Sequence, residues 1–196
     1  MSSISLSRPN SRKKIHTRTI ECNGYQREDG FWNIEGVITD TKTYSFDNND
    51  REGIMSGESI HNMSVRLTID NGMTVIDAEA ITTAWPYHLC KRAAPSAKIL
   101  KGLKVGPGWR KAVSKAIGRT KGCTHIRDLI MGPVAQTAYQ TIVPMQTIIE
   151  ARVKATKPKN WRPAVLGTCF AHDSDGPVVK RIWPEFFTHK LTDEDK

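Results

Sequence analysis

Apolar and polar side chains alternate along two stretches in the first half of the chain. The alternation is less clean over residues 32–39, where Val37 falls among the polar positions, and strict over residues 63–70. A period of two residues is typical of a strand with one face against a core, so both stretches are predicted to be strands. Asn71-Gly72 follows the second stretch and is the strongest short hairpin signal. We therefore expect a return strand from Met73 to about Thr83.

A further strand is predicted before these. Asp29-Gly30 is a turn signal that separates the strand beginning at Trp32 from an earlier strand around residues 18–25. Residues 47–58 are polar and are expected to form a loop. The first half of the chain is thus predicted to be an antiparallel meander of three or four strands.

The spacing of apolar residues becomes helical after Trp85-Pro86. Two short helices are expected before residue 122, and a long helix from Thr124 to about Lys154, kinked or split at Pro133 and Pro144. Because strands come first and helices follow, the fold class is predicted to be α+β.

The chain is long enough for one domain with a sizeable core. We expect a flexible N-terminus over residues 1–17, one domain over 18–156, and an extension over 157–196 that packs on the domain. No apolar run is long enough to cross a membrane, and the N-terminus lacks a signal-peptide pattern. We therefore expect a cytoplasmic protein without a membrane partner.

The net charge of +9 is concentrated in one segment. Residues 91–121 contain ten basic and no acidic residues, so the rest of the chain sums to −1. Such a segment indicates a small anionic substrate, with a solvated basic surface as the alternative. The candidate substrate-binding residues are Lys91, Arg92, Arg110 and Arg181. The aromatic residues do not alternate with basic ones, which argues against nucleic acid as the partner; a homo-oligomer is compatible with the sequence.

Cys123 and His125 lie at the predicted start of the long helix. A helix N-terminus lowers the pKa of a thiol, so Cys123 is expected to be a metal ligand or a nucleophile. His61 and Cys90 also lie at the ends of predicted elements, where a fold can bring ligands together. Thiolates and imidazoles suit zinc or iron, which makes His61, Cys90, Cys123 and His125 the candidate metal ligands. The alternative is that each is an ordinary buried cysteine or histidine.

Three carboxylates, in addition to His125, are candidates for transferring protons in catalysis. Asp77 and Glu79 are two residues apart and are expected to share a face with Val75, where they could act as general acid and base or complete a metal site. The alternative for this pair is the solvent face of the sheet. Asp175 lies in a turn close to His172 and could cap an active site.

Several motifs resemble a bacterial family catalogued as a domain of unknown function. They are Gly24-Tyr25-Gln26-Arg27-Glu28-Asp29-Gly30-Phe31-Trp32, Ile34-Glu35-Gly36, Thr39-Asp40-Thr41-Lys42, Gly122-Cys123-Thr124-His125 and Ser174-Asp175-Gly176-Pro177-Val178-Val179. The resemblance covers nearly the whole chain and implies no activity.

The order of elements also resembles NifU-type iron–sulfur scaffold proteins, in which three cysteines and an acidic residue hold the metal. Cys90 and Cys123 match two of those cysteine positions, while His61 stands near the first and Asn62 near the acidic ligand. Gly118-Arg119-Thr120-Lys121 replaces the proline-rich chaperone-binding loop. The resemblance implies a metal site, and the departures argue against cluster assembly with a chaperone.

The sequence favours a metal-dependent enzyme, a lyase or hydrolase, in which zinc or iron acts on a small organic anion. A metal or iron–sulfur carrier without its own reaction is the first alternative. A nucleic-acid-binding protein is the second.

Overall fold

The computed structural model describes residues 6, 8–153, 161–163 and 165–188. Its strands are β1 (His16–Gln26), β2 (Trp32–Lys42), β3 (Ser59–Ile69) and β4 (Val75–Ala84). Its α-helices are α1 (Trp109–Ile117), α2 (Thr124–Leu129), α3 (Ala135–Val153) and α4 (Pro177–Ile182). Short 3₁₀ segments are η1 (His88–Leu100), η2 (Arg119–Lys121), η4 (Phe170–His172) and η5 (Pro184–Phe186), and η3 (Ile130–Val134) is a π-helical turn.

Contacts divide the chain into two units, Met1–Gln146 and Thr147–Lys196. The division falls within α3, earlier than the expected boundary at residues 156 and 157, which lies outside the described residues. The first unit holds the sheet and the helices that follow it. The second holds η4, α4 and η5.

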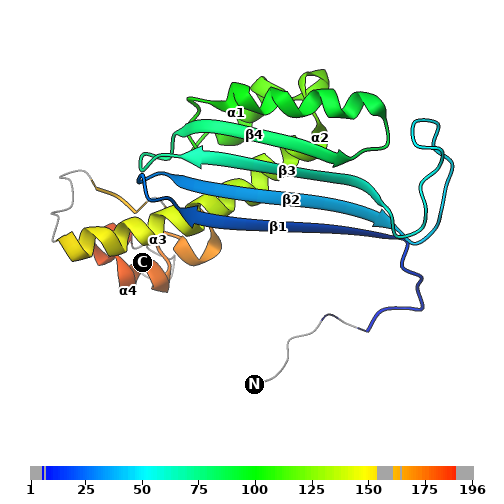
Figure 1. Ribbon diagram of the computed structural model, residues 1–196. Coiled ribbons are helices and arrows are strands. Elements are labelled where there is room, and N and C mark those ends of the chain that lie inside the picture. Colours follow the sequence, from blue (N-terminus) through cyan, green and yellow to red (C-terminus); the bar gives the residue numbers. More distant parts are fainter. Residues whose placement is uncertain (1–5, 7, 154–160, 164, 189–196) are drawn as a thin grey trace. The chain divides into compact units, whose positions relative to one another are not determined.

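The first unit confirms the predicted α+β class. Its four strands are paired antiparallel in the order β1-β2-β3-β4, so each strand is hydrogen-bonded to its neighbour in sequence (Figure 1). The alternation of apolar residues is what turns one face of this sheet toward the core. In β3, for example, Met63, Val65, Leu67 and Ile69 are buried.

The turn between β3 and β4 is longer than the two residues that Asn71-Gly72 predicts. The Asp70 amide donates to the Thr74 carbonyl, the Met73 amide donates to the Asp70 carbonyl, and Met73 has a positive φ of 66°. These features are typical of a three-residue hairpin loop that ends in a left-handed residue. The Asp70 carboxylate accepts from the Thr74 amide at 2.7 Å, which fixes the loop, and β4 consequently begins at Val75 rather than Met73.

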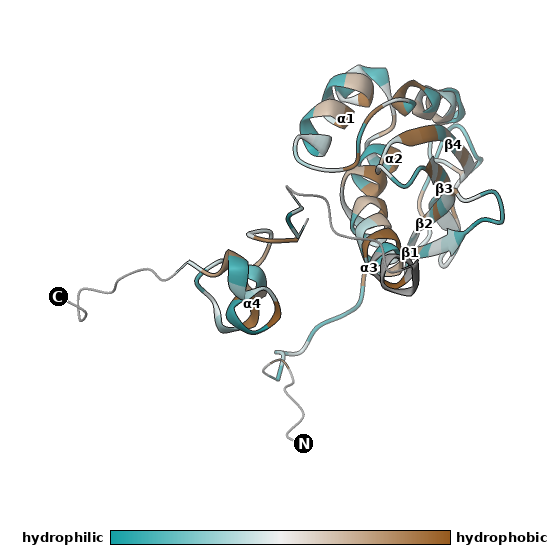
Figure 2. Ribbon diagram, turned by 90° about the vertical axis from the view of Figure 1, so that its left-hand side faces the viewer, coloured by the Kyte–Doolittle hydropathy of each residue, from teal (hydrophilic) through white to brown (hydrophobic). Residues whose placement is uncertain are grey.

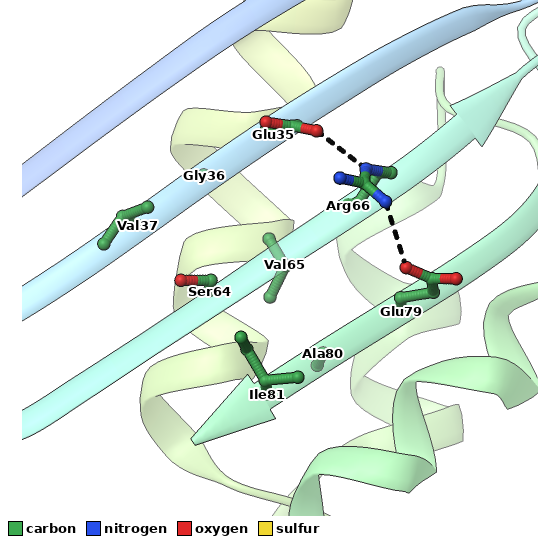
Figure 3. A pocket seen from close by; sticks show the side chains of 9 residues that line it. All are labelled: Glu35, Gly36, Val37, Ser64, Val65, Arg66, Glu79, Ala80 and Ile81. Atoms are coloured by element: carbon green, nitrogen blue, oxygen red, sulfur yellow. Dashed lines mark hydrogen bonds and ion pairs between the residues drawn. The ribbon is translucent and has the colours of Figure 1, made fainter. Parts of the chain in front are cut away.

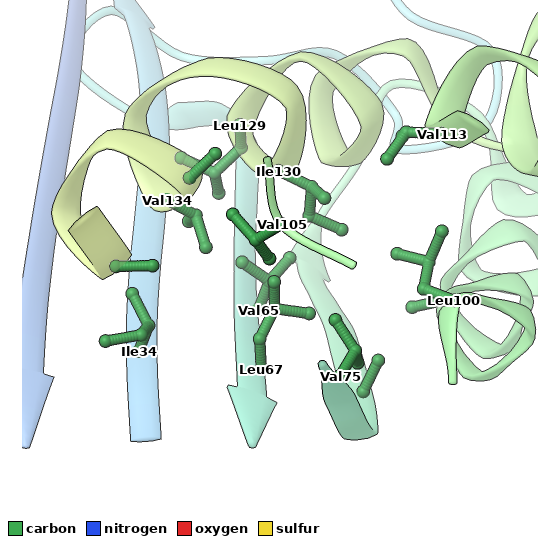
Figure 4. Close-up of a cluster of buried hydrophobic side chains, with 14 of the residues drawn as sticks. Ile34, Val65, Leu67, Val75, Leu100, Val105, Val113, Leu129, Ile130 and Val134 are labelled. Atoms are coloured by element: carbon green, nitrogen blue, oxygen red, sulfur yellow. The ribbon is translucent and has the colours of Figure 1, made fainter. Parts of the chain in front are cut away.

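Helices cover one face of the sheet. Leu100 from η1, Val113 from α1, Leu129 from α2 and Ile130 from η3 pack against the strands in one buried cluster (Figure 4). Figure 2 shows the same arrangement as hydrophobic stretches in the strands and in the helices beside them. The other face of the sheet carries charged side chains such as Glu35, Arg66 and Glu79, together with the exposed apolar residues Val37 and Ile81. This separation is the usual arrangement of an antiparallel sheet with one solvated face.

The long helix predicted from Thr124 is interrupted at Pro133 as expected, since the π-helical turn η3 contains this proline, while Pro144 lies inside α3. The π-helical turn η3 packs closely on the centre of β2. A Cβ atom at Gly36 would lie 2.6 Å from Cγ2 of Val134 and 3.3 Å from Cδ1 of Leu129. Glycine at position 36 therefore allows the helix to approach the strand.

Among the described residues, no helix is long and apolar enough to cross a membrane.

Replacing Gly36 with alanine is expected to lower the free energy of unfolding by about 1–3 kcal/mol, because the new methyl group overpacks against buried Val134. Gly132→Ala is the matched control, since a Cβ there meets no atom within 4 Å. Urea denaturation followed by circular dichroism measures both. Equal stability of the two variants would show that the contact at Gly36 is not tight.

Candidate functional site

The register of the sheet places three polar residues side by side. Arg18 on β1 is paired with Asp40 on β2, and Asp40 is paired with His61 on β3. Asp40 and His61 lie in phase with the inward-facing residues of their strands, Ile38 and Met63. The three side chains therefore lie on the helix-covered face, near one end of the sheet.

Asp40 is the buried carboxylate at the centre of this row, with a side chain only 2% exposed. Arg18 donates to it twice, from Nε to Oδ1 at 2.8 Å and from Nη2 to Oδ2 at 2.9 Å. His16 Nε2 lies 3.0 Å from Oδ1, and His61 Nδ1 lies 3.1 Å from Oδ2. Burial alone would raise the pKa of Asp40, but the hydrogen bond and charge of Arg18 and the contact with His16 lower it to about 2.

His125 reaches the same carboxylate from the helical layer. Its Nε2 atom lies 3.7 Å from Asp40 Oδ2, and its ring lies over that of His61, with centroids 3.9 Å apart. Its Nδ1 atom lies 3.8 Å from Sγ of Cys123. Cys123 is the N-cap residue of α2, so the start of this short helix places thiol and imidazole together.

His61 and His125 are both expected to be neutral near pH 7. Burial lowers the pKa of His61, and the charge of His125 lowers it further. Burial also lowers the pKa of His125, with a further contribution from Arg18. Neutral imidazole is the form that binds a metal ion or accepts a proton.

A pocket of about 580 Å³ opens beside these imidazoles, and we call it the Cys123 pocket. It is lined by His61, Met63, Pro86, Tyr87, Leu89, Cys90, Arg92, Ala93, Thr120, Lys121, Gly122, Cys123, Thr124 and His125. All four candidate metal ligands from the sequence line it, together with Arg92, one of the four candidate substrate-binding residues.

Within the described residues, one group of side chains could hold a metal ion. Asp40, His61 and His125 each offer a ligand atom, and these atoms lie within 4.8 Å of one another. We call this group the carboxylate–imidazole cluster. Cys90 and Cys123 line the adjacent pocket instead of joining the cluster.

Sequence reasoning did not select Asp40, Arg18 or His16. A signal for Asp40 was nevertheless present, because it continues the inward alternation of Trp32, Ile34 and Ile38. A carboxylate on the buried face of a strand needs partners, which makes it a candidate functional group.

Asp77 and Glu79 lie on the opposite face of the sheet. The register shifts where Ile69 pairs with Val75 and Thr68 pairs with Asp77, so Ile76 is bulged. Val75 is therefore buried while Asp77 and Glu79 are both exposed, so the pair lies on the solvent face and does not share a face with Val75.

Figure 3 shows that outer face, where Arg66 lies between Glu35 and Glu79 and contacts both. The hollow there has a volume of about 310 Å³ and no imidazole or thiol in its lining. It is therefore not the candidate site.

The remaining predicted residues lie elsewhere. The Lys91 ammonium lies 3.7 Å from the centroid of the Trp85 ring, and Arg110 is exposed on α1. Neither lines the Cys123 pocket. Asp175 and Arg181 belong to the second unit, where Asp175 lies in the turn before α4 and Arg181 lies within α4.

The lowered pKa of Asp40 predicts acid-dependent stability in the metal-free protein. Because the folded-state pKa is about 2 and the ordinary value is 3.8, this contribution is complete above pH 4 and is lost as the pH falls toward 2. Asp40→Asn is expected to lower the free energy of unfolding at pH 7 by about 1–2 kcal/mol, allowing for screening at the partly exposed Arg18. Denaturation at several pH values should show the difference from wild type closing between pH 4 and 2. A constant difference would exclude the ion pair as its cause.

Comparison with known proteins places these residues in a family. Residues 16–140, well over half of the chain, match the family described as a protein of unknown function, DUF2889. The matched range includes His16, Arg18 and the whole carboxylate–imidazole cluster, whereas Ser174–Val179 lies outside it. No curated protein and no solved structure matches, and the similarity to NifU-type scaffolds stays a prediction. The chain belongs to the DUF2889 family.

Proposed function

We propose that this protein is a metal-dependent enzyme that acts on a small organic anion. Asp40, His61 and His125 hold a divalent zinc or iron ion, and the substrate occupies the Cys123 pocket. The observation that carries the proposal is the convergence of two imidazoles and one carboxylate beside a pocket with basic residues in its wall.

The separations between ligand atoms fit a metal ion. Asp40 Oδ2 is 3.1 Å from His61 Nδ1 and 3.7 Å from His125 Nε2. Ligands about 2.0–2.2 Å from a common zinc ion have separations of this size. Two histidines and one carboxylate leave coordination positions open for water or substrate, as in catalytic zinc and non-haem iron sites.

The charges around the cluster favour a metal that binds imidazole. Arg18 offsets the negative charge of Asp40. The affinity of the cluster for a metal ion therefore depends on the two neutral imidazoles more than on the carboxylate. Mg²⁺ and Ca²⁺ prefer oxygen ligands, whereas zinc and iron accept nitrogen. Arg18 and His16 act on the carboxylate as hydrogen-bond donors that fix its orientation.

The pocket wall supports an anionic substrate. Arg92 and Lys121 line it, and none of the described residues in its lining is acidic. A metal ion in the cluster would polarise a substrate carbonyl or lower the pKa of bound water. Arg92 and Lys121 would hold a carboxylate or phosphate of the substrate, which supports a reaction at the level of a lyase or hydrolase.

Purified protein without an affinity tag is expected to bind about one equivalent of zinc or ferrous iron. His125→Gln and Asp40→Asn are expected to weaken zinc binding at least about tenfold, because each removes a ligand. His88→Gln is the control, since His88 lines neither the cluster nor the pocket. Equilibrium dialysis with metal analysis measures all four proteins, and circular dichroism checks their fold. Absence of stoichiometric metal in wild type, or equal affinity in all four, would contradict the proposal.

A second candidate function uses Cys123 as a nucleophile. Two consecutive contacts favour it. Sγ of Cys123 lies 3.8 Å from Nδ1 of His125, and Nε2 of His125 lies 3.7 Å from Oδ2 of Asp40. A base beside a thiol, itself oriented by a carboxylate, is the arrangement of cysteine acyl-transfer enzymes. The thiol would give its proton to His125 and attack an acyl carbon. The leaving group would take that proton, and water would then hydrolyse the acyl-enzyme.

Alkylation rates separate the two candidates. If Cys123 is a nucleophile, iodoacetamide should modify it at pH 7 at least about tenfold faster than Cys90, and His125→Gln should remove the difference. Cys22 is an internal reference of low reactivity, because burial raises the pKa of its thiol. Mass spectrometry of digested protein measures the three rates. Equal rates at Cys123 and Cys90 would exclude the nucleophile.

A further inference from the structure

A second pocket also borders His61, and we call it the Lys42 pocket. Its volume is about 360 Å³, and it is lined by His16, Arg18, Asp40, Lys42, Phe46, Ile60, His61, Pro86 and Tyr87. His61, Pro86 and Tyr87 also line the Cys123 pocket. The two pockets are therefore neighbours that share one wall.

The Lys42 pocket has an excess of positive charge. Arg18 and Lys42 line it together with His16, and among the described residues of its lining Asp40 alone is acidic. Both oxygens of Asp40 already accept hydrogen bonds from Arg18, so this carboxylate does not neutralise Lys42. Among the described residues, Lys42 has no carboxylate within ion-pair distance.

Donors remain available for a ligand. Arg18 uses two of its five N–H groups to donate hydrogen bonds to Asp40, and its side chain is 42% exposed. The Lys42 ammonium is held over two aromatic rings, 5.0 Å from the centroid of Tyr44 and 4.6 Å from that of Phe46. These contacts restrain the ammonium group without using its charge on an anion.

The walls of this pocket are fixed by the loop between β2 and β3. Phe46 and Ile54 pair across this loop through two backbone hydrogen bonds of 3.0 Å. Asn48 donates to the Pro86 carbonyl at 3.0 Å, and the His88 amide donates to Asp50 at 2.6 Å. The loop therefore holds the segment that both pockets share.

We infer that the Lys42 pocket binds a carboxylate or phosphate group, and that the ligand of this protein is an organic molecule with two anionic ends. One end lies by Lys42 and Arg18, the other by Arg92 and Lys121. The apolar middle lies along Pro86 and Tyr87, and Tyr87 is 62% exposed in the free protein. The assignment of the second end rests on the proposed function, while the anion subsite at Lys42 stands apart from it.

Inorganic phosphate tests the subsite in metal-free protein, so that failure of the metal proposal leaves this result unaffected. Calorimetric titration at constant ionic strength should give binding that Lys42→Gln weakens about tenfold, the loss of one charge-assisted contact. Lys98→Gln is the matched control, an exposed lysine outside both pockets. Equal weakening in both variants, or none in either, would overturn the subsite.

Dicarboxylates from succinate to suberate test the two-ended ligand, each against the monocarboxylate of equal chain length. At least one dicarboxylate should bind wild type about tenfold more tightly than its partner. Lys42→Gln and Arg92→Gln should each abolish that preference, and Lys98→Gln should retain it. A wild-type protein that does not distinguish the two series would overturn the assignment.

Discussion

The burial of Asp40 is the constraint on which the site depends. A carboxylate removed from water costs free energy unless charged or polar partners surround it. Here those partners come from two neighbouring strands, with Arg18 on one side and His61 on the other. A slip of one residue in either pairing would turn the partners to the solvent face. The strand part of the site therefore forms only when the sheet has the correct register.

The sheet and its order could be predicted because the information is local. Alternation over residues 63–70 and the turn signals at 29–30 and 71–72 lie within short windows, and they indicate strands that pair with their neighbours in sequence. Pro133 likewise marks the interruption of the long helix from local stereochemistry. The bulge at Ile76 has no such signal, because Val75 and Ile76 are both apolar and either could face inward. That ambiguity explains why Asp77 and Glu79 were expected to share a face with Val75, whereas they lie on the solvent face that the sequence also allowed.

The candidate site was predictable only in part. His61, Cys90, Cys123 and His125 were selected as ligand-type residues at element ends, and the fold brings all four to one pocket. The contact of His61 with Asp40, by contrast, depends on a cross-strand register set by a loop of sixteen residues between β2 and β3. No local pattern determines that register. The position of Arg18 opposite Asp40 depends in the same way on the first hairpin.

The π-helical turn has a consequence for the direction in which His125 points. Ile126, Ile130, Val134, Ala138 and Ile142 follow one another at steps of four, and all are fully buried. In a straight α-helix each such step would advance about 40° around the axis, so the row would wind away from the sheet. The π-helical turn η3 has more residues per turn, so each residue in it rotates the chain less and the excess rotation is partly reversed. The π-helical turn thereby keeps the buried side of the helix in line with the sheet. Ile126 stays against the sheet, and its neighbour His125 faces the carboxylate of Asp40.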